Sequence, residues 1–462
     1  MKEPLFKEFP EVKADQWKSR IQKDLRGEDY EQNLIFNTLD GISIQPFYTP
    51  GDVKERKELP PPGSWRITEQ ISIDSAAKGN DKIKEALDKG AESLWLLFPS
   101  EDIELKTLFR EVDLGNVQIY FKFNFLSEEF STRLDTFLKD KNGEFFLQID
   151  PIGHLTKEGN FFYDHKKDFT VLKAIKDSTN RFGSIISIDA SLYQNAGANI
   201  PQQLGYSLAH LEEYLNFLDH EGEDLKKFQP QFIMATGSNY FLEIAKFKAL
   251  RQIYRSLAET YSIMKPCIIL ALPTRRNKTI YDYNVNLLRT TTECMSAILG
   301  GVDAVTNLPY DLLYKKESEF GRRIARNQLL IMKHEAYFGK VSNPADGSYY
   351  IESLTSQFVD AAMKVFEEVK AKGGFFKLLE IGEIQQNIKE SAEREQALFE
   401  KGELILIGTN KYQNNQERMK ENLEVDPFDA PIPVNTLIAP IVEIRLSAAQ
   451  EKERLQKELI ES

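Results

Sequence analysis

The sequence predicts an α/β protein built around a (β/α)₈ barrel (TIM barrel), with an N-terminal extension arm and a C-terminal helical tail. Two observations predict this fold: short β-rich apolar runs alternate with segments of helical period, and these units continue from residue 64 to 375 without a break. Such alternation requires a parallel sheet, because each crossover helix returns the chain so that the next strand runs in the same direction. A doubly wound open sheet is the alternative, and the unbroken series of units favours the barrel.

Residues 1–63 are expected to form the arm. Trp17, Ile21 and Leu25 recur at a spacing of four, which predicts a short amphipathic helix over residues 14–25. A short strand is expected over residues 42–47. The proline run at residues 60–62, followed by glycine, predicts a semi-rigid linker that joins the arm to the barrel.

The predicted barrel, residues 64–375, contains nine β-rich runs, which we interpret as one preliminary strand followed by eight β/α units. Helices are clearest over residues 239–262 and 282–299, where apolar residues recur at spacings of three and four. The nine runs lie at residues 67–73, 93–98, 117–123, 145–149, 184–188, 231–235, 267–272, 302–306 and 348–351.

The tail, residues 376–462, has a different character. It carries a charged helical segment at 383–400, a short predicted strand at 404–407, a loop at 426–433 and a final charged helix at 448–461. Because the tail has few apolar stretches from which to build a core, we expect it to pack on the barrel and not to fold independently.

The composition excludes several classes of function. The 462 residues carry a net charge of −12, which argues against binding to nucleic acid or to an anionic membrane surface. The two cysteines, Cys267 and Cys294, lie in apolar stretches and cannot build a disulfide framework or a metal site. The sequence shows no signal-peptide core and no run of 18 apolar residues. We therefore expect a soluble, cytoplasmic protein.

In a barrel, the reactive groups lie in the loops where strands end and helices begin. The loop at residues 189–198 carries Tyr193 and Gln194 as candidate hydrogen-bonding groups. The alternative is a turn shaped by Asn195 and Gly197, and neither candidate has a histidine partner close in sequence.

The loop at residues 273–278 holds the strongest positive cluster at a strand end. Arg275 and Arg276 could pair with an anionic ligand, whereas a solvated loop is the plainer interpretation. Three other polar groups near strand ends are expected to be caps or loop contacts: Asp150, His154 and Asp189. No nucleotide-binding glycine motif, nucleophile elbow or paired-cysteine motif occurs. The residues alone leave the function undetermined.

Several ordered motifs carry a resemblance to a known family. They are SNYFLEIAK at residues 238–246, RTTTE at 289–293 with Gly300-Gly301 after it, RRIARN at 322–327, PADGSYYIESLT at 344–355 and GTNKY at 408–412. In this order they closely resemble the adenosylcobalamin-dependent acyl-CoA mutases, and in particular methylmalonyl-CoA mutase. The resemblance covers most of residues 65–415.

The resemblance implies a barrel that encloses the acyl-CoA and a separate flavodoxin-like domain that holds cobalamin through a DxHxxG motif. No DxHxxG occurs in this sequence; the histidine-containing segment at residues 219–222 has the wrong spacing. We therefore expect no cobalamin-binding domain and no cofactor bound by this chain.

The substrate side also departs from the family pattern. Anchoring on residues 195–198 places Ser191 at the family's tyrosine and Leu192 at its histidine, and leucine can neither donate a proton nor form a hydrogen bond. The tyrosine that begins active barrels has no counterpart in residues 63–72, and the family's cobalamin-contacting loop is replaced at residues 272–276. We expect no catalytic, cofactor-binding or metal-binding residue, only vestigial active-site positions: Ser191, Leu192, Gln194, Thr274, Arg275 and Arg276.

Some members of this family are heterodimers with a small subunit that is related to the catalytic chain but has lost the active site. This sequence is similar to such subunits, including its N-terminal pattern at residues 9–10, 17, 27–30 and 45–49. The resemblance implies a structural role in an isomerase, with a large catalytic subunit that carries adenosylcobalamin as the partner and the arm wrapped against it. Two alternatives stay open: a catalytic barrel that borrows a separate cobalamin-binding chain, and a barrel that binds a regulatory anion through Arg275 and Arg276.

Overall fold

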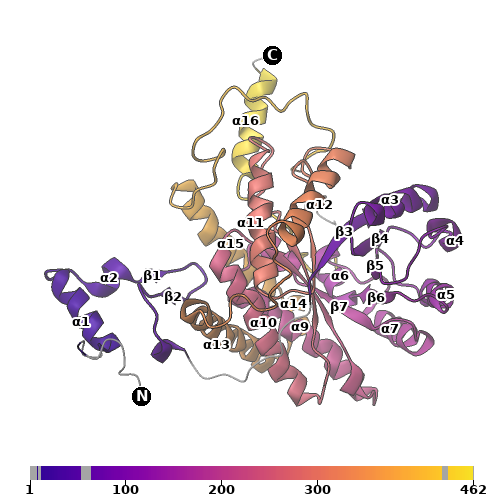
Figure 1. Cartoon of the computed structure of the whole chain (residues 1–462). Coiled ribbons are helices and arrows are strands. Elements are labelled where there is room, and N and C mark those ends of the chain that lie inside the picture. The colour runs from indigo at the N-terminus through magenta and orange to yellow at the C-terminus, as the bar shows by residue number, and fades with distance from the viewer. Residues whose placement is uncertain (1–7, 9–11, 54–63, 429–434, 461–462) are drawn as a thin grey trace.

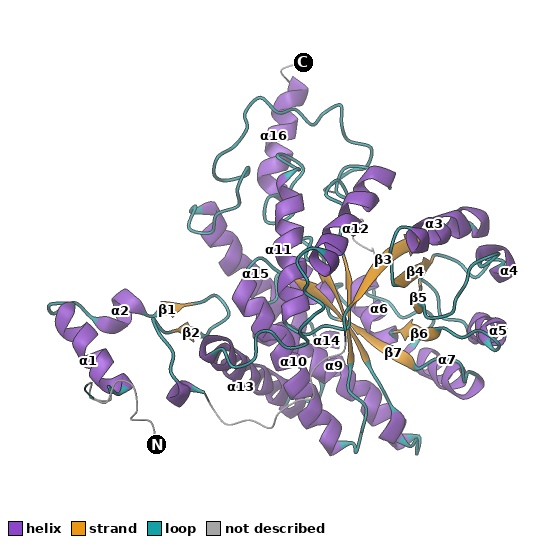
Figure 2. Ribbon diagram, viewed as in Figure 1, coloured by secondary structure: helices purple, strands orange, loops and turns teal. Residues whose placement is uncertain are grey.

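The computed structural model describes residues 8, 12–53, 64–428 and 435–460, and its centre is a closed barrel of eight parallel strands (Figures 1 and 2). The strand order around the barrel is β10-β3-β4-β5-β6-β7-β8-β9, so neighbours in sequence are neighbours in space until β10 meets β3. This confirms the predicted (β/α)₈ fold. The strands are β3 (Arg66–Ser72), β4 (Ser93–Phe98), β5 (Gln118–Phe123), β6 (Glu144–Ile149), β7 (Ser184–Asp189), β8 (Gln231–Thr236), β9 (Ile268–Pro273) and β10 (Ala304–Thr306).

Helices surround the barrel (Figure 2). Their buried apolar residues share one hydrophobic core with apolar side chains of the strands. Several helices begin at a serine or aspartate whose side chain accepts a hydrogen bond from the backbone N–H three residues on; Ser127, Asp150 and Asp164 are examples. The helices around the barrel are α3 (Ala76–Asp88), α4 (Leu105–Leu108), α5 (Glu128–Leu138), α6 (Pro151–Glu158), α7 (His165–Ser178), α8 (Ser191–Asn195), α9 (Ile200–His220), α10 (Tyr240–Thr260), α11 (Val285–Leu299), α12 (Glu319–His334) and α13 (Tyr349–Ala371), with the 3-10 turn η2 (Leu225–Lys227) before β8.

The ninth predicted strand, residues 348–351, is wrong: these residues form the junction with α13 and its first turn. Ile351, Leu354, Phe358 and Ala362 are buried at spacings of three and four, which is the helical period. A short β-rich run at a helix start cannot be told from a strand by its composition. The run at residues 67–73, predicted as a preliminary strand, is accordingly the first strand of the barrel.

The barrel closes along a short seam between β10 and β3. β10 has three residues and pairs with β3 only from Ala304↔Arg66 to Thr306↔Thr68, whereas β3 pairs with β4 up to Ser72. The carboxyl half of β3 therefore has no strand partner on its β10 side. Helix α12 covers it, and Glu69 of β3 forms ion pairs with Arg322 and Arg326 of that helix.

The arm lies to one side of the barrel (Figure 1). It consists of α1 (Ala14–Asp24), α2 (Tyr30–Leu34), the two-residue strands β1 (Phe36–Asn37) and β2 (Ser43–Ile44), and the turn η1 (Pro50–Asp52). The predicted helix is confirmed, but the strand predicted over residues 42–47 shrinks to β2. Ser43 N donates to the side-chain Oε1 of Gln357 on α13 and Ser43 O accepts from its Nε2, both at 3.2 Å, while the Asp40 carboxylate accepts a 2.7 Å bond from Ile200 N. No residue of α1 is buried. The proline linker lies outside the described residues.

The tail contains α14 (Phe375–Glu380), which spans the predicted boundary at residue 376, followed by α15 (Glu383–Glu400) and α16 (Ala448–Ile460). The strand predicted at residues 404–407 is wrong, because the described residues there form only an isolated bridge between Ile407 and Lys411. Residues 435–447 run past helices α6 and α8 and the loop that follows β9: Ile441 N donates to Thr156 O, Ile444 N to Asn195 O and Leu446 N to Arg276 O. We call this segment the strap.

Candidate functional site

The inside of the barrel is filled by side chains. Trp95, Tyr120 and Phe146 point inward from β4, β5 and β6, and all three are buried. The Tyr120 and Phe146 rings stack with centroids 5.2 Å apart, while Trp95 Nε1 donates a 2.7 Å hydrogen bond to the amide oxygen of Gln148. Aliphatic side chains complete this inner cluster: Ile233, Ile268, Leu270, Leu272, Ala304 and Leu308.

Two hollows open at the carboxyl ends of the strands. The first, of about 540 Å³, lies at the ends of β5, β6 and β7, where Lys122 and Asp189 meet with Nζ and Oδ2 2.5 Å apart. Burial opposes ionisation of Asp189, but Lys122 and the Ser191 hydroxyl outweigh it and hold the pKa of this carboxyl below its usual value. The second, of about 220 Å³, lies beside the β10–β3 seam and is called the seam pocket below.

A buried polar network lies behind the first hollow. Asp150 Oδ1 accepts hydrogen bonds from Tyr214 OH at 2.7 Å and from Gly153 N at 2.8 Å, and lies 2.9 Å from His210 Nε2. The other ring nitrogen of His210 lies 3.0 Å from the hydroxyl of Tyr193.

Asp150 is ionised in this network. Burial would raise the pKa of Asp150, but the interaction with His210 and the surrounding donors holds it below its usual value. The arrangement resembles an acid–base relay. Tyr193 and His210 are 1% and 0% exposed, so no substrate can reach them and the network is structural.

The first three predicted positions lie on α8, which follows β7. Ser191 donates to Asp189 Oδ1 at 2.5 Å, and Leu192 is 5% exposed and belongs to the main core while touching the first hollow. Gln194 lies against Gly237, and its amide oxygen accepts no hydrogen bond within the described residues. Gly197 has φ +99°, which confirms the predicted turn.

The other three predicted positions follow β9 and point to different places. Thr274 Oγ1 donates to Asn195 Oδ1 at 2.8 Å, and the Arg275 backbone N–H donates to the same oxygen at 2.9 Å. Arg276 is 3% exposed; it pairs with Glu395 of α15 and donates to Ile444 O of the strap at 2.8 Å. Arg275 alone reaches the seam pocket. The six positions therefore do not form one site, and Arg276 cannot serve the anionic ligand that we considered for it.

The long-range contacts that organise this face could not be read from the sequence. His210 lies 60 residues from Asp150 in the middle of α9, and Asn195 joins two loops 79 residues apart. Only the position of Asp150 just before Pro151 signalled a helix cap, and that prediction is confirmed by its bond from Gly153 N.

Comparison with known proteins now decides the family. A family model described as methylmalonyl-CoA mutase matches residues 101–454. The chain belongs to this family. A methylmalonyl-CoA mutase small subunit from Porphyromonas gingivalis (strain ATCC BAA-308 / W83) is 34% identical over 449 residues, which cover 90% of this chain and 72% of that protein. A methylmalonyl-CoA mutase small subunit from Streptomyces virginiae is 29% identical, and the alignment covers 90% of this chain and 73% of that protein. A methylmalonyl-CoA mutase from Cereibacter sphaeroides is 27% identical, and the alignment covers 89% of this chain and 66% of that protein.

Methylmalonyl-CoA mutase motifs have structural roles in this chain. Glu293 of RTTTE receives hydrogen bonds from Lys278 Nζ at 2.7 Å and Asn277 Nδ2 at 2.7 Å, all three buried. Arg289 of the same motif donates to Ile407 O at 2.7 Å and so holds the GTNKY segment. The motifs thus fasten the loops after β9 and the start of the tail to the barrel.

The described residues also lack two further features. No cluster of three or more histidine, cysteine, aspartate or glutamate side chains there could hold a metal ion. None of the helices in the same residues is both long and apolar enough to cross a membrane.

Proposed function

We propose that this chain is a non-catalytic small subunit of a heterodimeric methylmalonyl-CoA mutase. In this proposal the large subunit carries adenosylcobalamin and interconverts methylmalonyl-CoA and succinyl-CoA. The present chain stabilises it through a large interface. Relatives that are named small subunit support the assignment. The two buried thiols without a disulfide favour a cytoplasmic location.

The filled barrel is the observation that carries the proposal. A barrel that encloses an acyl-CoA must keep space along its axis. Here Trp95, Tyr120 and Phe146 occupy that space, and such aromatic side chains each bury roughly 150–250 Å². Leu192 stands where the family's histidine is expected and is packed in the core, so the substrate carbonyl would meet no hydrogen-bond donor there.

The carboxyl face of the barrel also does not fit a cobalamin. His210 is fully buried beside Asp150 and Tyr193, and the His154 ring stacks on Phe162 with centroids 3.6 Å apart. Thr274 and Arg276, which stand in for the cobalamin-contacting loop, bind Asn195 and the strap. We therefore assign none of the cofactor's chemistry to this chain.

The arm supplies a candidate surface for the partner. Val12, Trp17, Phe36 and Leu39 are 67%, 51%, 63% and 43% exposed, although all are large and apolar. Exposed apolar groups gathered on one segment are typical of a surface that another chain covers. We infer that the large subunit buries them.

Coexpression with the large subunit from the same genome tests the proposal. We expect the two chains to copurify and to form succinyl-CoA when adenosylcobalamin is added. Trp17→Asp with Phe36→Asp should abolish copurification, whereas Met264→Asp, at a residue 82% exposed on the barrel, should not. A large chain that is fully active alone and never associates with this one would contradict the proposal.

The same assay addresses the catalytic alternative. The present chain is mixed with a stand-alone cobalamin-binding chain and adenosylcobalamin, without the large subunit. We expect no turnover, because the barrel axis is filled. Turnover above the blank in that mixture would establish the alternative instead.

A further inference from the structure

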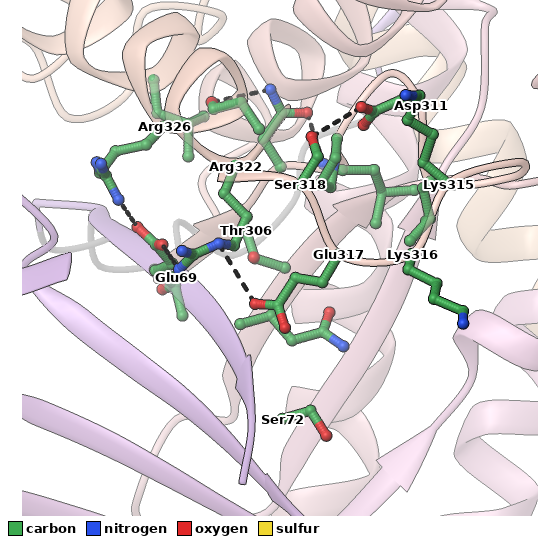
Figure 3. Close-up of a pocket in the computed structure, with 18 of the residues that line it drawn as sticks. Glu69, Ser72, Thr306, Asp311, Lys315, Lys316, Glu317, Ser318, Arg322 and Arg326 are labelled. Carbon is green, nitrogen blue, oxygen red and sulfur yellow. Dashed lines mark hydrogen bonds and ion pairs between the residues drawn. The ribbon is translucent and has the colours of Figure 1, made fainter. Parts of the chain in front are cut away.

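The seam pocket lies where the barrel closes, between the carboxyl half of β3, the loop that follows β10 and the first turns of α12 (Figure 3). Arg275, from the loop after β9, forms part of its wall. The ends of the last two barrel strands, here β9 and β10, are where TIM-barrel proteins frequently bind phosphate groups. The lining of the seam pocket contains five basic residues and three acidic ones. The basic residues are Arg275, Lys315, Lys316, Arg322 and Arg326, and the acidic ones are Glu69, Asp311 and Glu317.

The two arginines at the back of the pocket are held in place. Arg326 is 5% exposed and pairs with Glu69, and the Arg322 guanidinium lies 3.1 Å from Glu85 and 3.5 Å from Glu69. Neither arginine uses its Nε–H in a hydrogen bond within the described chain, although both Nε atoms are buried. Arg322 Nε has only Glu317 Oε1 near it, at 3.3 Å. Arg322 Nε thus has an ion-pair partner but makes no hydrogen bond in the described part of the chain, and that partner is a carboxylate that an external anion can replace.

The basic groups at the rim are held loosely. Lys315 Nζ lies 3.3 Å from Glu424, and Arg275 lies 3.6 Å from Glu443, both in solvent-exposed pairs. Exposed pairs of this kind contribute only about 0–1 kcal/mol, so an anion can recruit these cations at little cost. Lys316 is exposed, and its ammonium group makes no ion pair in the part of the chain described here.

The acidic groups of the lining are already engaged. Asp311 accepts a 2.8 Å hydrogen bond from Ser318 Oγ, and Glu69 is committed to the two arginines. Glu317 pairs with Lys82 at 2.5 Å and with Arg322 (Figure 3). Glu317 therefore sits where an external anion would compete for Arg322.

We propose that the seam pocket binds the phosphate group of a phosphate monoester. Arg322 provides a fixed guanidinium at the back, and Arg275, Lys315 and Lys316 close on the phosphate oxygens from the rim. The volume of about 220 Å³ is smaller than sites that enclose a drug-sized ligand, so the organic part of the ester projects out of the barrel face. The site is separate from the first hollow and does not depend on the proposed subunit role.

Isothermal titration of the full chain, alone and bound to the large subunit, tests the site at constant ionic strength. The probes are glycerol 3-phosphate, inorganic phosphate and glycerol. A phosphate monoester could come from a small metabolite or from the 3′-phosphate of a nucleotide. Coenzyme A and dephospho-coenzyme A distinguish these sources, because they differ only in that 3′-phosphate. We expect both phosphates to bind and glycerol not to bind.

Matched variants locate the binding. Lys316→Ala should raise the Kd for glycerol 3-phosphate about tenfold, because a charge-assisted contact is lost. Arg323→Ala removes the same charge from an exposed position on α12 outside the pocket and should change the Kd less than about twofold. Glu317→Gln removes the competing carboxylate and should lower the Kd.

The outcomes separate clearly. Equal weakening by Lys316→Ala and Arg323→Ala, or no binding of either phosphate by a folded chain, overturns the proposal. If coenzyme A binds more tightly than glycerol 3-phosphate and dephospho-coenzyme A does not bind, the site is supported and the nucleotide is identified as the source. Preference for glycerol 3-phosphate supports the site and identifies a small metabolite.

Discussion

Asp150 shows how a residue at a catalytic-looking position has become structural. Its carboxylate lies at the end of β6, where an enzyme of this fold would place a reactive group. Instead both oxygens are used up: Oδ1 faces Gly153 N, Tyr214 OH and His210 Nε2, and Oδ2 accepts from Asp189 N at 3.0 Å. A carboxylate with this many donors around it fixes the geometry of the barrel mouth.

Asp150→Asn should destabilise the chain by about 3 kcal/mol, because a buried acceptor is replaced by an amide whose N–H groups face other donors. Urea unfolding measures the change. Asp164→Asn is the matched control: Asp164 caps α7 through a single bond from Lys167 N in an exposed position, and asparagine caps equally well. A loss for Asp150→Asn as small as that of the control would contradict the role of the network.

The same residue, Asp150, should make the free energy of unfolding depend on pH in the acidic range. The pKa of Asp150 is lowered in the fold, so its ionised form contributes stability that is fully present above its usual pKa and is lost as pH falls through the folded value. The Asp150→Asn variant should lack this part of the acid dependence. Thermal unfolding between pH 7 and pH 3 compares the two chains, and parallel curves would contradict the expectation.

At the scale of elements, the sequence predicted the helices and strands that a local pattern of apolar residues marks. The helix at residues 239–262 became α10 (Tyr240–Thr260), and eight of the nine predicted runs became strands. The failure at residues 348–351 came from judging a strand by composition across a helix start. The contacts that join Asn195 to Thr274, or Arg276 to the strap, could not be predicted because they connect residues 79 and 168 positions apart.

The seam between β3 and α12 is a second element-scale feature that can be tested. Arg326→Leu leaves Glu69 buried without its main partner and should cost about 3–5 kcal/mol. The double variant Arg326→Leu with Glu69→Leu should recover most of that loss, since a buried pair and an apolar pair of similar volume differ little. Guanidinium unfolding of the four chains gives the coupling energy; additive losses would show that the pair is not a unit.

The docking of the arm should depend on pH through Asp40. Burial, together with Glu243 and Glu395, raises the pKa of Asp40 to about 6, against the opposing effects of Ile200 N–H and Lys246. Because the docked state favours the neutral acid, this contribution to docking is fully present below the usual pKa near 3.8 and is lost as pH rises through about 6.

Hydrogen exchange at the Ser43 amide, which bonds to Gln357, reports on docking. After correction for the intrinsic rate, protection in the wild-type chain should fall about tenfold between pH 5 and pH 7. Asp40→Asn keeps an acceptor for Ile200 N without the charge, so its protection should stay constant. A wild-type profile as flat as that of the variant would rule out Asp40 as the cause.

At the scale of the whole molecule, the filled barrel and the strap act together. All eight strands surround one inner cluster, and α6, α8 and the loop that follows β9 are hydrogen-bonded to residues 435–447. None of this could be predicted from residue types alone, since the side chains that point inward are known only once the register of the barrel is known.

Trp95→Ala should destabilise the chain by about 3–5 kcal/mol, because the indole leaves a cavity that the closed barrel cannot collapse around. Chemical denaturation measures this loss. Phe241→Ala, at an aromatic residue 48% exposed on α10, is the control and should cost less. An equal cost for the two changes would show that the barrel axis is not tightly filled.

The short seam also has a consequence for how the chain folds. β10 can pair with β3 only after more than half of the sequence has been synthesised, and the Arg326–Glu69 contact closes a loop of 257 residues. Contacts of such sequence separation form late, because the entropy of closing the loop must be overcome first. Until then β3 is an edge strand, paired with β4 on one side only. We expect newly made chains to pass through an open sheet whose exposed first strand is the segment most in need of a chaperone.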